Sequence, residues 1–195
     1  NEHMFVDEIK LSVQSGAGGS GSVSFKKTSS KSSPSGGSGG QGGSVIITVN
    51  EELNDLSHII SNSSLKAENG TDGNKNFQNG KKGKDLIIEV PKGTKIKVKN
   101  EVYADLHENK SSFIVLEGSK AGRGNYDLIS KRVPNPQFCE HGEKRNKIEI
   151  KLTYSIYSDL VIVGLPNAGK STLITKLTNS KAQIADYEFT TTSPN

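Results

Sequence analysis

Short strand-like runs of apolar and polar positions recur along the chain up to about Tyr157. Residues 4–13, MFVDEIKLSV, alternate apolar and polar, which is the pattern of a half-buried β-strand. Shorter strand-like runs follow between turn residues, at 23–25, 45–49, 86–90, 95–98, 113–116 and 147–154. Many short strands joined by turns predict a mainly β unit that extends to about Tyr157. Residues 53–60 are compatible with a short helix.

The joins between these strands are rich in glycine. Residues 16–21 read GAGGSG, residues 36–43 read GGSGGQGG and residues 118–124 read GSKAGRG, while Gly70 and Gly73 are three apart, as are Gly80 and Gly83. A spacing near three suits polyproline II helices, which have three residues per turn. Several such clusters favour a packed layer of these helices. For the Ser- and Gly-rich stretch 27–43, a flexible linker is the alternative.

The pattern changes after Ser158. Residues 159–163, DLVIV, form a continuous apolar run, which is typical of a strand buried on both faces of a parallel sheet. We therefore predict two domains, at residues 1–157 and 158–195. The second would contain only the first strand, loop and helix of an α/β domain.

Residues 164–171, GLPNAGKS, match the phosphate-binding pattern GxxxxGK[ST]. The apolar strand precedes this motif, and a helix-compatible stretch at 170–179 follows it, as the motif requires. Gly164 and Gly169 let the loop approach a phosphate closely, and backbone N–H groups of 167–172 can form an anion nest. Lys170 would supply charge to the β- and γ-phosphates, and the Ser171 hydroxyl would bind Mg²⁺.

A polar loop, ADYEFTTTSPN, occupies residues 185–195. Phosphoryl-transfer switches use such loops, which the γ-phosphate orders. Any of Thr190, Thr191 and Thr192 could offer a second hydroxyl to Mg²⁺, and the residue pattern does not choose among them.

Composition excludes several protein classes. The chain has 25 basic and 21 acidic residues, a formal charge of +4, 31% hydrophobic residues and a single cysteine. There is no run of 18 apolar residues for a membrane span, and one cysteine forms no internal disulfide. Residues 66–99 hold nine lysines and four acidic residues, either as a solvated face or as a patch for RNA phosphates. Phe77 and Tyr103 are nearby, but single aromatic residues make a poor stacking platform.

Two further patterns resemble functional motifs but do not indicate a site. GAGGSG matches the dinucleotide-binding pattern GxGxxG, but a strand rather than a helix follows it and no acidic residue lies at the expected distance. Cys139 and His141 are two residues apart, yet no third catalytic group can be named, so an ordinary cysteine is the preferred interpretation.

These stretches together resemble the Obg family of GTPases. The matching segments are MFVDEIKLSVQSGAGGSGSVSFKK, GGSGGQGGSV, AENGTDGNKNFQNGKKGKDLIIEVPKGT, GRGN, IVGLPNAGKSTL and KAQIADYEFTTTSPN. The resemblance covers nearly the whole chain. It implies a mainly β Obg fold, with glycine-rich helices over a small β-barrel, followed by the start of a Ras-like G domain.

The resemblance also assigns the nucleotide site. GTP or GDP would contact Gly164, Leu165, Pro166, Asn167, Ala168, Gly169, Lys170, Ser171, Thr172, Phe189, Thr190, Thr191, Thr192 and Ser193. Ser171 and Thr191 would bind Mg²⁺, and Lys170 and Thr191 would act in catalysis. Asn167 stands where some similar G proteins help to bind K⁺. The implied partners are the large ribosomal subunit and its rRNA, which the N-domain would reach in the peptidyl-transferase region.

The resemblance has gaps. The stretch KKTSSKSSPSGG is Ser-rich where the family is basic, and GSKAGRG is thin in glycine. The DxxG and guanine-reading NKxD motifs would follow Asn195, so we expect a piece of a longer GTPase that alone hydrolyses little GTP. The alternatives are a ribosome- or rRNA-binding module without hydrolysis, and an ATPase. We expect a monomer without a membrane segment, in the cytoplasm or in the matrix of a plastid or mitochondrion.

Overall fold

The strands form two sheets and a separate hairpin. The computed structural model describes residues 4–99, 101–106 and 111–157, and this part of the chain contains ten strands and no helix. The five-stranded sheet has the order β5–β1–β10–β7–β8, built from Ser63–Lys66, Met4–Gln14, Ile148–Tyr157, Thr94–Val98 and Glu101–Leu106. The three-stranded sheet has the order β6–β4–β9, built from Leu86–Val90, Val45–Val49 and Ser112–Leu116. The hairpin pairs β2 (Phe25–Thr28) with β3 (Lys31–Pro34).

One apolar core lies between the two sheets. β1 pairs antiparallel with β10 over ten residues, and Leu11 lies opposite Ile150 in this register. Alternate residues of each strand point inward, so Leu11, Ile47 and Ile96 from different strands are all buried in the same cluster. The mainly β fold predicted from the alternating pattern is confirmed.

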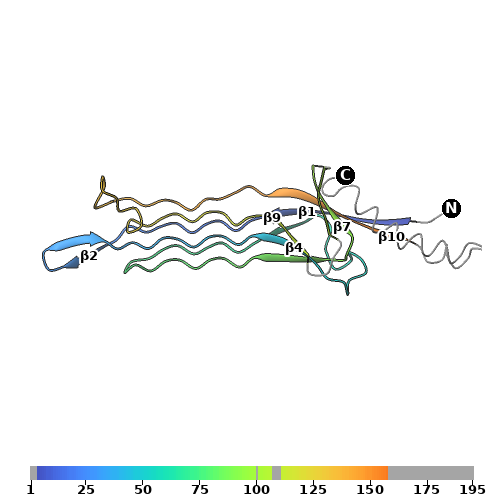
Figure 1. Cartoon of the computed structure of the whole chain (residues 1–195), viewed down its shortest axis with the longest axis horizontal. Coiled ribbons are helices and arrows are strands. Elements are labelled where there is room, and N and C mark those ends of the chain that lie inside the picture. Colours follow the sequence, from blue (N-terminus) through green and yellow to red (C-terminus); the bar gives the residue numbers. More distant parts are fainter. Residues whose placement is uncertain (1–3, 100, 107–110, 158–195) are drawn as a thin grey trace, which may run out of the picture.

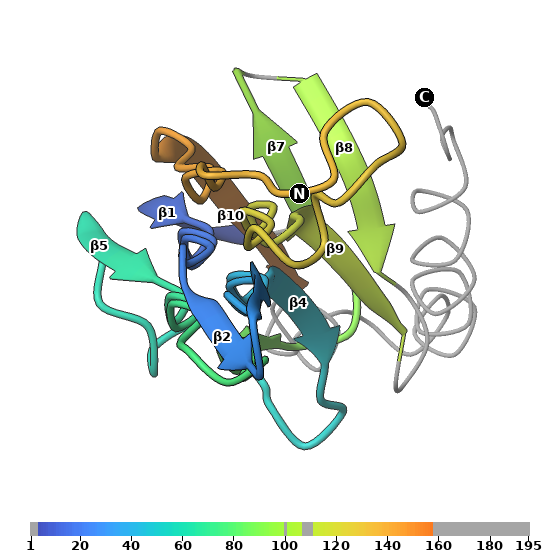
Figure 2. The same cartoon turned by 90° about the vertical axis from the view of Figure 1, so that its left-hand side faces the viewer.

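The glycine-rich segments form a bundle that extends from the sheets to the β2–β3 hairpin (Figure 1). Viewed from the hairpin end in Figure 2, these segments are seen end-on as tight coils. Their backbones are joined by hydrogen bonds that recur every third residue. Between the first two segments, the N–H groups of Gly16, Gly19 and Ser22 donate to the carbonyls of Gly43, Gly40 and Gly37, at 2.9, 2.8 and 3.0 Å. This repeat is that of polyproline II helices.

Close contact between backbones explains the glycines of the bundle. A Cβ atom on Gly19 would overlap the carbonyl of Thr71, and one on Gly40 would overlap the carbonyl of Lys81. Only glycine allows backbones to approach this closely. The prediction of a packed layer is therefore confirmed, and for 35–43 the flexible-linker alternative is wrong.

Asparagine or aspartate precedes several of these glycines. The Oδ1 atoms of Asn69, Asp72 and Asn79 accept hydrogen bonds from the backbone N–H groups of Ala17, Ser20 and Ser38, at 2.9, 2.8 and 2.9 Å. In each of these Asn-Gly or Asp-Gly pairs, the glycine packs against one neighbouring backbone. The side chain of the preceding residue accepts a hydrogen bond from an amide of another segment. These bonds supply amide partners that a polyproline II helix does not provide, because it has no internal hydrogen bonds.

Some elements differ from the prediction. The helix expected at 53–60 is wrong, because the side chains of Asn50 and Asp55 accept hydrogen bonds from backbone N–H groups two residues on and hold turns instead. Such local bonds compete with helix formation. Val23 is not part of the strand expected at 23–25, which begins at Phe25. Strands β3 and β5 lie in sequences too polar to have been predicted as strands, and β8, EVYADL, was not predicted either.

Candidate functional site

The predicted nucleotide site lies outside the described residues. This applies to Gly164–Thr172 and to Phe189–Ser193, and also to the strand and helix expected around them. The roles of Lys170, Ser171 and Thr191, and the domain boundary after Tyr157, therefore stay predictions. The described residues present instead a second candidate site, at the end of the bundle farthest from the sheets.

Three loops meet at this end, which we call the tip. They are the β2–β3 hairpin, the turn at 74–78 and the loop at 125–138, which follow different segments of the bundle. Asn125 joins the loop at 125–138 to the residues on either side of the hairpin. Its Nδ2 group donates to the carbonyls of Ser24 and Pro136 at 3.0 and 3.1 Å, and its Oδ1 accepts from the N–H of Gly36 at 2.7 Å. Asn125 is fully buried, and each of these bonds satisfies a polar group that burial would otherwise penalise.

Phe77 projects from a strained turn at the tip. Asn76 and Phe77 both have positive φ angles, of 58° and 59°, and the Gln78 N–H donates to the carbonyl of Lys75 at 3.3 Å. Two consecutive positive φ angles define a type I′ turn, in which the second position usually carries glycine. A left-handed conformation costs a residue with a side chain about 1 kcal/mol or more. The Phe77 N–H is held by the carbonyl of Ser35 at 2.8 Å.

An aromatic pair and a lysine gather around this turn. The rings of Phe77 and Tyr126 meet edge to face, with centroids 4.9 Å apart and planes at 79°. The Lys26 Nζ lies 5.8 Å from the centroid of Phe77, within the range of a cation–π contact. Phe77 is 43% exposed and Tyr126 is 48% exposed. The expectation that aromatic residues stand singly here is wrong, because folding brings together two rings that are far apart in the sequence.

Other exposed apolar side chains extend this surface. They are Val23, Phe25, Ile129, Val133 and Phe138, each 38–53% exposed. Exposed apolar side chains that gather in one place mark interaction sites. Aromatic rings with neighbouring lysines are the chemistry that unpaired nucleic-acid bases and their phosphates require.

A tight ion pair ties the tip loop to the bundle. Arg123 donates to Glu140 from Nε and from Nη2, at 3.0 and 2.9 Å, and its backbone N–H also donates to Glu140 at 3.0 Å. The hydrogen bonds from Arg123 lower the pKa of Glu140 to about 2, and the same pairing raises the pKa of Arg123. The two residues come from neighbouring segments of the bundle, so the pair fixes the start and the end of the loop between them.

The lysines of 66–99 do not form one surface. β6 belongs to the three-stranded sheet and β7 to the five-stranded sheet. Lys81, Lys82 and Lys84 precede β6 and lie along the bundle. Lys95 and Lys97 share the outer face of β7. The predicted lysine-rich face is thus divided between two regions of the molecule.

The described residues offer no alternative metal centre. Among them, no group of three or more His, Cys, Asp or Glu side chains is placed to hold a metal ion. Cys139 is a half-buried free thiol. A membrane-crossing helix is likewise not found in the ranges that the structure describes.

Two family models match the chain. The GTP1/OBG model matches residues 6–156, and a model described as a 50S ribosome-binding GTPase matches residues 159–195. Among curated proteins, a GTPase Obg of Nautilia profundicola is 44% identical over 98% of this chain and 55% of its own length. A GTPase Obg of Finegoldia magna is 41% identical over 98% of the chain and 47% of its length.

A GTPase Obg of Persephonella marina is also similar, at 41% identity over 97% of the chain and 57% of its own length. The chain thus spans about half the length of the curated relatives it matches. The first family model covers most of the residues and includes the whole glycine-rich bundle. On this match, and as its sequence resemblance predicted, the chain belongs to the GTP1/OBG family.

Proposed function

We propose that the whole protein is an Obg-type GTPase that acts on the large ribosomal subunit, in its assembly or in stress control. This proposal rests on one observation: the same chain contains a glycine-rich GTP1/OBG domain and the phosphate-binding motif GLPNAGKS. The bacterial relatives named GTPase Obg support the assignment. A module without hydrolysis is less favoured, because the model that matches 159–195 describes a GTPase.

The residues predicted for the nucleotide fit the chemistry of a phosphate-bound Mg²⁺ ion. Mg²⁺ prefers oxygen ligands and is held by few protein groups together with phosphate oxygens. The hydroxyls of Ser171 and Thr191 are such ligands, and the ion would neutralise charge on the transferring phosphoryl group. Lys170 would stabilise the same charge, while the backbone N–H groups of 167–172 would hold the phosphates. Asn167 would contribute to a K⁺ site beside them.

The tip supports docking on rRNA. Its half-exposed rings of Phe77 and Tyr126, next to Lys26, suit unpaired bases and their phosphates. The bundle would act as a rigid spacer, because its backbones are bonded to one another along their length. A soluble monomer in the cytoplasm, or in an organelle matrix with bacterial-type ribosomes, is compatible with this role.

Co-sedimentation with large ribosomal subunits tests the docking. We would compare the native 195-residue chain with Phe77→Gly, which removes the ring and suits the positive φ angle of this position. Ile60→Gly is the control, because Ile60 is 77% exposed and lies near the sheets. Loss of binding in Phe77→Gly alone would support docking by the tip. Equal binding by all three proteins would contradict it.

Nucleotide turnover by the whole protein tests the enzymatic part. We expect Mg²⁺-dependent hydrolysis of labelled GTP. Unlabelled GTP and GDP should compete with the labelled substrate, and ATP should not. Lys170→Ala should abolish the hydrolysis, because the lysine stabilises charge that develops during phosphoryl transfer. Competition by ATP at equal concentration would favour the ATPase alternative.

A further inference from the structure

One residue of the glycine-rich bundle holds both members of an Asn-Gly pair. Ala17 donates its N–H to the Oδ1 atom of Asn69 at 2.9 Å, and its carbonyl accepts the N–H of Gly70 at 2.8 Å. The asparagine side chain and the backbone nitrogen that follows it are therefore fixed by the same neighbouring residue. We call such a pair of hydrogen bonds a clamp.

The clamp recurs elsewhere in the bundle. Ser38 holds Asn79 and Gly80 in the same way, at 2.9 and 2.8 Å. Aspartate replaces asparagine in two further clamps, where bonds of 2.8 Å join Ser20 to Asp72–Gly73 and Ser44 to Asp85–Leu86. The side chain serves as an acceptor in each of these bonds, so asparagine and aspartate fulfil the same role.

Asn69–Gly70 and Asn79–Gly80 are also the two Asn-Gly sequences of the chain. In a flexible chain such a sequence deamidates spontaneously, because glycine has no Cβ that would obstruct its backbone nitrogen. This nitrogen loses its proton and attacks Cγ of the asparagine. The new N–Cγ bond closes a succinimide ring, while the Cγ–Nδ2 bond breaks and Nδ2 leaves with the proton as ammonia. Water then adds across either C–N bond of the ring and gives aspartate or isoaspartate.

The clamp opposes this reaction at both of its reacting groups. The proton that must leave Gly70 is held by the carbonyl of Ala17, and the carboxamide of Asn69 is held by the N–H of the same residue. The backbone of Gly70 also lies against the carbonyl of Gly40, which restricts its rotation. The nitrogen and the carboxamide must give up these contacts before they can meet.

Burial does not protect the two asparagines. Asn69 and Asn79 are both exposed, so water reaches them. Their protection therefore depends on the bundle staying closed. Local opening begins at mobile turns and chain ends. Asn79 directly follows the turn at 74–78 and Asn69 lies farther along the bundle, so opening from the tip would reach Asn79 first.

The isoaspartyl product would not fit a clamp. It leads the main chain through Cβ and Cγ, so the backbone becomes longer by one carbon atom. The bonds of the bundle recur every third residue, and a longer backbone shifts the following bonds of its segment out of register. The ordinary aspartyl product keeps the native backbone, and Asp72 already occupies a clamp.

We propose that Asn69 and Asn79 are deamidation sites that the closed bundle protects, and that opening of the bundle converts them to isoaspartate, which prevents the bundle from closing again. A transient opening would thus leave a permanent covalent change. The inference concerns the bundle alone and does not depend on the proposed GTPase function or on the partner of the tip.

The test incubates the 195-residue chain in mildly alkaline buffer, with and without guanidinium chloride. Peptide mapping that separates aspartyl from isoaspartyl peptides measures the conversion of each asparagine. One hydrogen bond corresponds to about a fivefold change in an equilibrium, so the two bonds of a clamp predict conversion about 30-fold slower in the folded chain. Equal rates with and without denaturant would overturn the proposal, whether or not any variant folds.

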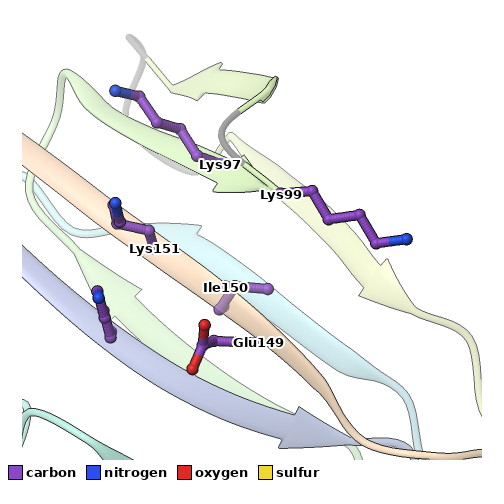
Figure 3. A pocket seen from close by; sticks show the side chains of 6 residues that line it. Lys97, Lys99, Glu149, Ile150 and Lys151 are labelled. Carbon is purple, nitrogen blue, oxygen red and sulfur yellow. The ribbon is translucent and has the colours of Figure 1, made fainter.

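Ala17→Pro opens one clamp locally. Proline suits a polyproline II segment but has no N–H to donate to Asn69. We expect Asn69 to convert about fivefold faster than in the native chain, and Asn79 of the same molecule to keep its native rate. Lys97→Gln is the control and should change neither rate, because Lys97 lines a hollow on the five-stranded sheet (Figure 3). A native rate at Asn69 in folded Ala17→Pro would contradict protection by the clamp.

Refolding tests the second part of the proposal. Chains converted in denaturant are returned to buffer, and closure of the bundle is measured by resistance to protease. Isoaspartyl chains should stay susceptible. The freshly prepared double variant Asn69→Asp, Asn79→Asp carries the same added charge on a normal backbone and should become resistant. Isoaspartyl chains that resist protease as well as this variant would show that the longer backbone is tolerated and would overturn this part.

Discussion

The side-chain oxygen of Asn125 accepts a hydrogen bond of 2.7 Å from the backbone N–H of Gly36, a residue of another segment of the bundle. The same side chain donates to the carbonyls of Ser24 and Pro136. One amide group thereby connects three stretches of chain that meet at the tip. The aromatic surface around Phe77 depends on this connection, because the loop that carries Tyr126 begins at Asn125.

Replacing Asn125 should loosen the tip and destabilise the protein. Asn125→Ala leaves the N–H of Gly36 and the carbonyl of Pro136 without their partner in a buried place, whereas the carbonyl of Ser24 keeps its bond from the N–H of Ser35. One unsatisfied buried group costs about 1–3 kcal/mol. We expect the free energy of unfolding, measured by urea denaturation, to fall by about 2 kcal/mol or more. Asn69→Ala is the control, because Asn69 makes an exposed hydrogen bond. A loss no larger than that of the control would show that water replaces the Asn125 side chain.

A methyl group in the bundle should be poorly tolerated. In Gly40→Ala the new Cβ would overlap the backbone carbonyl of Lys81, which cannot move without breaking its hydrogen bond to the N–H of Thr71. Overpacking in a dense interior costs about 1–3 kcal/mol and sometimes more. We expect the urea midpoint to fall accordingly or the bundle to unfold. Lys82→Ala, at an exposed neighbouring position, should leave the midpoint nearly unchanged.

The Arg123–Glu140 pair should make stability depend on pH in the acidic range. Folding lowers the pKa of Glu140 from 4.5 to about 2, so the stabilising contribution is complete above about pH 4.5 and is lost as the pH falls toward 2. Glu140→Gln should therefore lower the urea midpoint at pH 6 and have a smaller effect at pH 2.5. Glu52→Gln, in an exposed turn, serves as the control. An effect of Glu140→Gln that grows as the pH falls would contradict the pairing.

Potassium should accelerate GTP turnover by the whole protein. If Asn167 helps to hold K⁺ beside the phosphates, the ion neutralises charge that develops in the transition state. We expect turnover to be several-fold faster in KCl than in NaCl, and Asn167→Ala to remove the difference. Lys181→Ala, outside both nucleotide segments, should preserve it. Equal turnover of the native protein in the two salts would rule out this role.

Local spacing was sufficient to predict several parts of the molecule. Alternation at 4–13 and the strand-like run at 45–49 predicted strands that the structure contains, and glycines three apart predicted a packed layer of helices. The nucleotide site was also predicted from adjacent residues, in GLPNAGKS, and that prediction awaits the experiments above. In each case the pattern depends on the period of the backbone or on the chemistry of consecutive residues.

Other features could not be predicted because their partners are far apart in the sequence. β3 and β5 are polar runs whose pairing is set by the hairpin and by the edge of the large sheet. At 53–60 local turns replace the expected helix, and a distant partner holds them: the Leu56 N–H donates to the side chain of Asp7 on β1, and the Leu56 side chain is buried in the core. Tertiary contacts of this kind override weak local preferences.

The sequence by itself determined the strand-forming runs, the glycine repeat and a phosphate-binding loop, since each follows from residues close along the chain. Only the tertiary structure decided that Phe77 meets Tyr126, that Asn125 holds the tip together, and that Ala17 holds both Asn69 and Gly70. The physical reason is register: the pairing of distant strands and segments brings these side chains together, and it is set by burial of a common core and by contact between glycine backbones.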